Sequence, residues 1–148
     1  MRLVVAARSA TRVCPTRALD PQLARRLAVG LGALRALLGI TALAVPALPA
    51  APWVGPDEAK RPAVRLFART LGGRDLALGL GAVMAARDGA PVRGWVEAGA
   101  LADAGDTAAT VLGFGELPRR SRWLVLGLTV GAAVAGAVLA PFVDRATS

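Results

Sequence analysis

The sequence contains no histidine and no tyrosine, and it has a single cysteine, Cys14, and a single lysine, Lys60. Without histidine the chain has no imidazole ligand for haem, no zinc site of the histidine type and no histidine-based catalytic triad. One cysteine permits no disulfide within the chain. These absences exclude large classes of metal-dependent and nucleophilic enzymes.

The sequence is rich in apolar residues. They make up 55% of the chain and are mostly alanine, leucine and valine, since aromatic residues contribute only 4%. The mean hydropathy is +0.52, and long runs of leucine, alanine and glycine favour membrane spans over a large soluble core. The preference for arginine over lysine, with abundant alanine, glycine and proline, indicates a bacterial genome of high GC content.

The net charge of +8 is compatible with nucleic-acid binding or with a membrane. The arginines lie at the ends of apolar segments and do not gather on one aromatic-rich face. Flanking cations of this kind orient membrane proteins and contact anionic lipid. We therefore expect the lipid bilayer as partner, and no nucleic acid.

Four apolar stretches are long enough to cross a bilayer as helices: residues 27–48, 63–86, 94–114 and 123–143. The first would measure about 33 Å against a hydrocarbon core of about 30 Å. A cleaved signal peptide is the alternative for this stretch, although its apolar core is too long and contains Arg35. A soluble amphipathic helix is the alternative for 63–86, which several charges interrupt. Residues 49–62, rich in proline and charge, are predicted to form a loop.

This pattern predicts an all-α protein, a four-transmembrane-helix bundle with a short arginine-rich tail. Residues 1–22 would be a flexible cytoplasmic tail, 23–143 the membrane domain and 144–148 a short exposed end. The tail resembles a transit-type sequence in composition, and a misassigned start codon is a further interpretation.

Four spans place both chain ends on one side of the membrane. On that side lie nine basic residues: Arg2, Arg8, Arg12, Arg17, Arg25, Arg26, Arg87, Arg93 and Arg145. The opposite side carries five: Lys60, Arg61, Arg119, Arg120 and Arg122. Because basic loops face the cytoplasm, the count predicts cytoplasmic termini in the bacterial inner membrane, although the cluster at 119–122 opposes it.

A polar stripe interrupts the third apolar stretch. At 100° per residue, Asp103, Asp106, Thr107 and Thr110 fall within about 100° of one another on a helix. In the predicted topology, Arg35, Arg74 and Asp75 lie at a similar depth; we list these seven residues as one buried polar cluster. A lone charge at mid-bilayer costs about 2.5–3.5 kcal/mol, so the two arginines are expected to face the three aspartates.

The cluster has two interpretations, because three carboxylates exceed two guanidinium groups by one. The surplus acid could be protonatable and relay a proton or hold a cation. Alternatively, the cluster is a static network that fixes helix register, which is the interpretation we favour.

No catalytic constellation is evident elsewhere. Ser9, Ser121 and Ser148 lie in tails or loops without a base to activate them. Asp103 and Asp106 match only half of an acidic metal motif. We therefore predict no enzyme, metal site or cofactor. Gly127, Gly131 and Ala135 have the spacing of a helix contact, which indicates ordinary packing or, alternatively, dimerisation.

Three motifs occur in order along the spans: Arg35-Ala-Leu-Leu-Gly39, Gly73-Arg-Asp-Leu-Ala-Leu-Gly79 and Asp103-Ala-Gly-Asp106. Together, over residues 25–143, they resemble a family of small four-helix membrane proteins of high-GC bacteria whose function is unknown. That family is loosely similar to the DoxX-like group. The resemblance implies a four-helix membrane bundle and says little about activity.

These expectations lead to one leading function and two alternatives. The leading one is an integral membrane protein with a structural or accessory role, whose partner would be a second copy of the chain or another membrane protein. The first alternative is a proton- or cation-coupled transporter of a small solute that uses Asp103 and Asp106. The second, by analogy with DoxX-like proteins alone, is a membrane redox accessory subunit.

Overall fold

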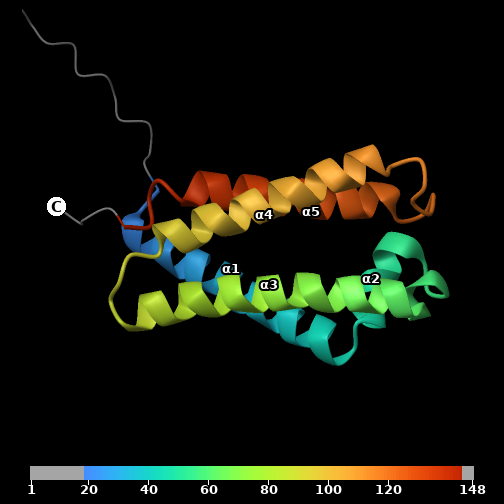
Figure 1. Cartoon of the computed structure of the whole chain (residues 1–148). Helices are drawn as coiled ribbons and strands as arrows, with labels where there is room; N and C mark the ends of the chain where they lie inside the picture. The colour runs from blue at the N-terminus through green and yellow to red at the C-terminus, as the bar shows by residue number, and fades with distance from the viewer. Residues whose placement is uncertain (1–18, 145–148) are drawn as a thin grey trace, which may run out of the picture.

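The computed structural model describes residues 19–144, and over this range all of its regular secondary structure is helical (Figure 1). Its elements are α1 (Pro21–Ala44), α2 (Ala47–Val54), the 3₁₀-helix η1 (Glu58–Lys60), α3 (Pro62–Arg87), α4 (Arg93–Leu112) and α5 (Arg122–Leu139). The all-α prediction is confirmed. Most of the expected tail, with Cys14, and residues 145–148 lie outside the described range.

Proline and aspartate determine where the first helix begins and ends. Pro21 occupies its first turn, where a missing N–H costs nothing, and Asp20 Oδ1 accepts the N–H of Gln22 at 3.1 Å as an N-cap. The helix ends at Ala44 because Val45 precedes a proline and adopts φ −127°, ψ 67° instead of a helical conformation. α1 is therefore shorter at this end than the predicted span 27–48.

Residues 49–62 were predicted to be a loop, and this is wrong for their first part, since α2 covers 47–54. The prolines that suggested a loop do not prevent a helix here, although Pro52 lies inside it. Pro46 is the N-cap and Pro49 lies in the first turn, where backbone N–H groups have no partner within the helix. At the other end of the chain, α5 stops at Leu139, just before Pro141, and not at 143.

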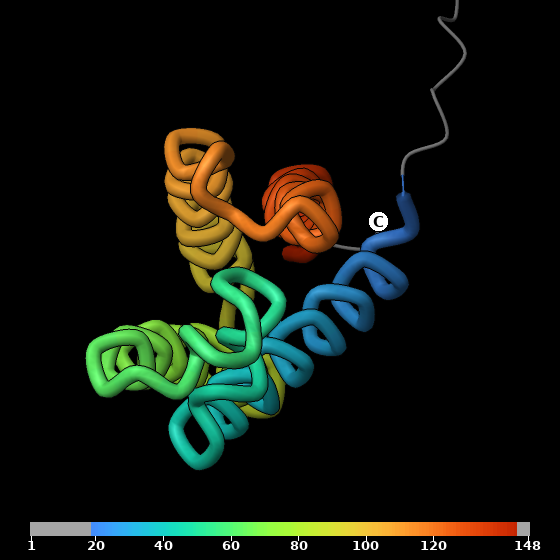
Figure 2. The backbone as a smooth tube through the Cα atoms, turned by 90° about the vertical axis from the view of Figure 1, so that its right-hand side faces the viewer, coloured from blue at the N-terminus to red at the C-terminus, as the bar shows by residue number. Residues whose placement is uncertain are grey.

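The four long helices run in alternating directions and associate as two pairs, α1 with α3 and α4 with α5. The start of α1, the α3–α4 turn and the end of α5 lie together at one end of the molecule, and α2 and the α4–α5 loop lie at the other (Figure 1). Figure 2 shows α3, α4 and α5 nearly end-on, whereas α1 runs obliquely past them.

Glycines bring α1 and α3 into backbone contact. Gly32 and Gly39 on α1 are seven residues apart, as are Gly72 and Gly79 on α3. A Cβ atom added to Gly79 would lie 2.3 Å from the carbonyl oxygen of Gly32, and one added to Gly39 would lie 2.5 Å from the amide nitrogen of Leu76. The helices can approach this closely only without side chains at these positions.

Small residues fill the interior, and large apolar residues face outward. The buried set on α1 is Ala24, Ala28, Gly32, Gly39 and Ala42, whereas Leu37 is 59% exposed and Leu112 on α4 is 89% exposed. Two helices, α1 and α5, are long and apolar enough to cross a membrane. α3 and α4 have the length but carry more internal charges.

Two of the three positions in the predicted contact stripe on α5 are open within residues 19–144. Among these residues, no atom beyond its own helix lies within 4 Å of a Cβ added to Gly127 or Gly131. At Gly136, by contrast, an added Cβ would lie 2.9 Å from Cβ of Ala100. Dimerisation through Gly127, Gly131 and Ala135 stays a prediction.

The α1–α3 contact predicts opposite effects of two alanine substitutions on the same helix. Gly79→Ala would force the backbones apart and lower the free energy of unfolding by about 1–3 kcal/mol. Gly73→Ala, where an added Cβ meets nothing within 4 Å, would raise it by about 0.5–1 kcal/mol through helix propensity. Unfolding in detergent followed by circular dichroism measures both, and equal effects would contradict the glycine contact.

Candidate functional site

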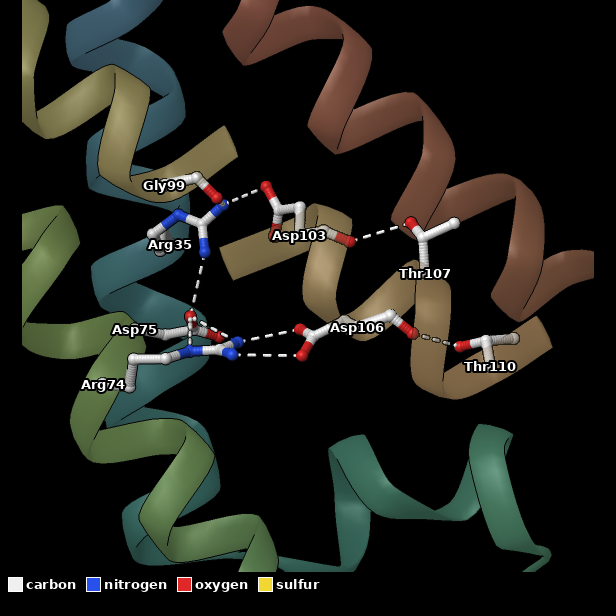
Figure 3. Close-up of polar contacts among 8 residues, drawn as sticks. All are labelled: Arg35, Arg74, Asp75, Gly99, Asp103, Asp106, Thr107 and Thr110. Carbon is white, nitrogen blue, oxygen red and sulfur yellow. Dashed lines mark hydrogen bonds and ion pairs between the residues drawn. The ribbon is translucent and has the colours of Figure 1, made fainter. Parts of the chain in front are cut away.

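Five charged side chains from three helices form one continuous network between the two helix pairs (Figure 3). Followed along its ion pairs, the network alternates in sign and begins and ends on α4: Asp103, Arg35, Asp75, Arg74, Asp106. The sequence predicted that these arginines would face these aspartates, and the structure brings all five together.

Arg35 links α1 to both other helices. Its Nη1 donates to Oδ1 of Asp75 at 2.9 Å, and its Nη2 donates to Oδ2 of Asp103 and to the carbonyl oxygen of Gly99 at 3.4 Å. The side chains of Arg35 and Asp103 are only 11% and 10% exposed, so water screens this pair little. A Cβ on Gly99 would lie 3.4 Å from Nε of Arg35, which leaves little room for a larger residue.

Arg74 and Asp106 form a two-point pair between α3 and α4. Nη1 donates to Oδ1 at 3.0 Å and Nη2 donates to Oδ2 at 2.8 Å. Parallel hydrogen bonds of this kind fix the relative orientation of the two groups as well as their distance. The pair therefore sets the rotation of α4 relative to α3.

Asp75 is shared between the two arginines. Its Oδ1 accepts from Nη1 of Arg35 and, at 3.2 Å, from Nη2 of the adjacent Arg74. The surplus carboxylate foreseen from the sequence thus bridges two cations. Within residues 19–144 no donor is bonded to Oδ2 of Asp75 or to Oδ1 of Asp103, so each can accept a further hydrogen bond.

The two threonines of the predicted stripe share the face of α4 but do not take part in the ion pairs. The hydroxyl of Thr107 donates to the carbonyl oxygen of Asp103 at 2.8 Å, and that of Thr110 donates to the carbonyl oxygen of Asp106 at 2.7 Å (Figure 3). Threonine in a helix satisfies its hydroxyl in this way, four residues back. They therefore adjoin the polar cluster through the backbone of Asp103 and Asp106 and not through an ion pair.

A small, largely apolar cleft lies beside the network, between α1, α3 and α4. Arg35 and Gly99 line it together with small side chains and Trp95. The Trp95 ring is held close to α3 because residue 81 is glycine: an added Cβ there would lie 2.3 Å from the ring. Within the described part of the chain, no group of three or more His, Cys, Asp or Glu residues is arranged to hold a metal ion.

A second polar site, at Asp144, was not anticipated from the sequence, which predicted only an exposed end for 144–148. Asp144 Oδ1 accepts from Nη1 of Arg25 and from the N–H of Val92, both at 3.1 Å, and Oδ2 accepts the N–H of Arg93 at 2.8 Å. Arg25 also donates to the carbonyl oxygen of Ala90 at 3.1 Å. The carboxylate therefore caps the start of α4 and ties the end of the chain to α1, but no sequence pattern reveals this long-range partner.

The network predicts that an unpaired Asp103 lowers the free energy of unfolding more than removal of both Arg35 and Asp103 does. Arg35→Leu strands Asp103, because Asp75 keeps Arg74, and should lower the free energy of unfolding by about 3–5 kcal/mol. The double variant Arg35→Leu/Asp103→Leu removes both charges and should recover most of this loss. Denaturant unfolding in detergent gives both values. A double variant as unstable as the sum of the two single variants would disprove the coupling.

Comparisons of the chain with protein-family models, with curated proteins and with solved structures find no match. The resemblance to small four-helix membrane proteins and to the DoxX-like group receives no support from them. Function is therefore inferred from the geometry of the two helix pairs and the network between them.

Proposed function

We propose that the chain is a four-helix integral membrane protein of the bacterial inner membrane with a structural or accessory role. The distribution of side chains supports insertion. A protein in water buries its large apolar residues, whereas here they face outward while alanine and glycine fill the interior. An apolar surface of this extent is unusual on a soluble monomer.

The charges of α3 and α4 are compatible with their crossing the bilayer. By their residue counts α3 and α4 would measure about 39 and 30 Å, against a hydrocarbon core of about 30 Å. Near the middle of these helices, Arg74, Asp75, Asp103 and Asp106 are all bonded to an opposite charge. Closer to the start of α3, Nε of Arg69 donates to the carbonyl oxygen of Leu43 at 3.2 Å. Pairing offsets the insertion cost that each would incur alone.

One observation supports the structural role: each arginine of the network connects its own helix to another helix. Each arginine bonds to two different aspartates, and the two arginines together join α1, α3 and α4 at one level along the bundle. Between helices surrounded by lipid, such bonds substitute for the missing hydrophobic driving force. The network therefore holds the helices in one arrangement, and a partner protein would bind to that arrangement.

Cytoplasmic termini are part of the proposal. Of the nine basic residues counted toward that side, the described residues place four near the end that holds the start of α1 and the α3–α4 turn: Arg25, Arg26, Arg87 and Arg93. The other five lie outside the described range, and within that range the opposite end carries five basic residues, so the orientation is supported by the count over the whole sequence, nine against five.

Proton- or cation-coupled transport is the second candidate, and the surplus carboxylate favours it. Asp75 and Asp103 each retain an oxygen without a donor among residues 19–144, and Arg35, which bonds to both, lines the adjacent cleft. The redox interpretation rests on the resemblance alone.

The topology predicts opposite accessibility of the two ends. In a Cys14→Ser background, a cysteine at Ala90 in the α3–α4 turn should react with an impermeant maleimide only after cells are opened. A cysteine at Glu116 in the α4–α5 loop should react in intact cells. The reverse pattern would overturn the orientation, and reaction of both positions in intact cells would contradict a membrane crossing by α4, the one helix between them.

The transport hypothesis predicts a separable effect of Asp75→Asn. This change leaves the Arg35–Asp103 and Arg74–Asp106 pairs, so the protein should fold. A proton or cation flux into proteoliposomes should nevertheless be lost, because the surplus acid is gone. If wild-type protein gives no flux above empty liposomes while Asp103→Asn and Asp106→Asn lower membrane yield, the structural role stands and transport is rejected.

A further inference from the structure

The α4–α5 loop carries a basic and aromatic surface that the buried network does not use. Residues 115–122 contain three arginines and one acid, Glu116. The N–H groups of Ser121 and Arg122 both donate to the carbonyl oxygen of Pro118, at 3.0 and 3.1 Å. Arg119 and Arg120 therefore lie next to each other in a tight turn, and both are exposed.

These two arginines have no acidic partner, unlike four of the other cations near the ends of the helices. Lys60 pairs with Asp57, and Arg61 with Glu58, at the same end of the molecule; Arg25 pairs with Asp144, and Arg93 with Glu97, at the other. Within residues 19–144, no carboxylate lies within 4.0 Å of Arg119 or Arg120. Their charge is available to an anion from outside the chain.

Aromatic rings place this loop at a membrane boundary. The Phe114 and Trp123 rings meet edge to face with centroids 4.9 Å apart, and the guanidinium carbon of Arg122 lies 5.2 Å from the Phe114 centroid. Trp123 is 70% exposed and Leu112 is 89% exposed. Exposed tryptophan at the end of an apolar helix is typical of the headgroup layer, where its ring contacts acyl chains and its N–H meets polar groups.

We propose that Arg119 and Arg120, beside the stack of Arg122, Phe114 and Trp123, bind the phosphate of an anionic phospholipid headgroup. Two adjacent guanidinium groups match the charge and the planar hydrogen-bonding geometry of phosphate. The aromatic rings and Leu112 would lie against the acyl chains of the same lipid. This inference rests on the proposed insertion of α4 and α5 in a membrane.

Native mass spectrometry of the full-length protein in a non-ionic detergent tests the site by titration with phosphatidylglycerol or phosphatidylcholine. Wild type should bind phosphatidylglycerol more tightly. Arg119→Gln/Arg120→Gln should weaken that binding by about fivefold for each arginine removed, with a smaller loss for phosphatidylcholine, whose phosphate charge is balanced by its choline. Both side chains are exposed and free of acidic partners, so the variant should unfold at the wild-type temperature.

Arg26→Gln/Arg87→Gln is the matched control, because it removes the same charge from two exposed arginines at the other end. It should keep the affinity of wild type for phosphatidylglycerol. An equal loss in the control would show that binding follows net charge, and equal affinity for both lipids in wild type would also reject the site. If inorganic phosphate competes at the same concentration as the lipid, the ligand is a free anion and the lipid assignment is wrong.

Alkaline extraction of cell membranes separates this inference from the function on which it rests. Protein that stays in the extracted membrane but shows no selectivity for phosphatidylglycerol would refute the lipid site alone. Protein released into the supernatant would refute membrane insertion, and the lipid site would fall with it.

Discussion

The structure depends on the constraint that a charge buried among apolar helices must have an opposite charge within bonding distance. Arg35 and Arg74 meet that constraint only if α1, α3 and α4 are aligned at one level. Each arginine bonds to a carboxylate on a helix other than its own. A shift of α4 by one turn would separate two pairs at once, so the network selects one register among many that the uniform apolar surfaces would allow.

The glycine contact between α1 and α3 is what brings the network within reach. Gly32 and Gly39 lie on either side of Arg35 in sequence, and Gly72 and Gly79 lie on either side of Asp75. Because both helices lack side chains where they touch, the guanidinium of Arg35 reaches Oδ1 of Asp75 at 2.9 Å. The packing motif and the charged motif are therefore interleaved on the same two helices, and neither is independent of the other.

Much of this arrangement could be predicted from the sequence. Hydrophobic run length gave the long helices to within a few residues, and the cost of buried charge predicted that Arg35 and Arg74 would meet the aspartates. The particular partners depend on helix rotation, which run length does not determine. The helix at 47–54 was missed because prolines end helices and also begin them. The cap by Asp144 was missed because it joins residues 52 positions apart. The seven-residue spacing of the contact glycines is visible in the sequence.

Asp75, and not Asp103 or Asp106, is the central carboxylate of the bonding pattern. Along the alternating order Asp103, Arg35, Asp75, Arg74, Asp106, neutralising the central member leaves two separate pairs of opposite charge. Neutralising either end member also leaves equal numbers of each charge, but both arginines then compete for contacts that include Asp75, and one helix-to-helix link is lost. A neutral residue in place of Asp75 would therefore keep both ion pairs that join the two helix pairs, Arg35 with Asp103 and Arg74 with Asp106. The structural and the transport hypotheses assign different tasks to this one carboxylate: a fixed bridge between two cations, or the group that gains and releases a proton while the outer pairs hold the bundle together.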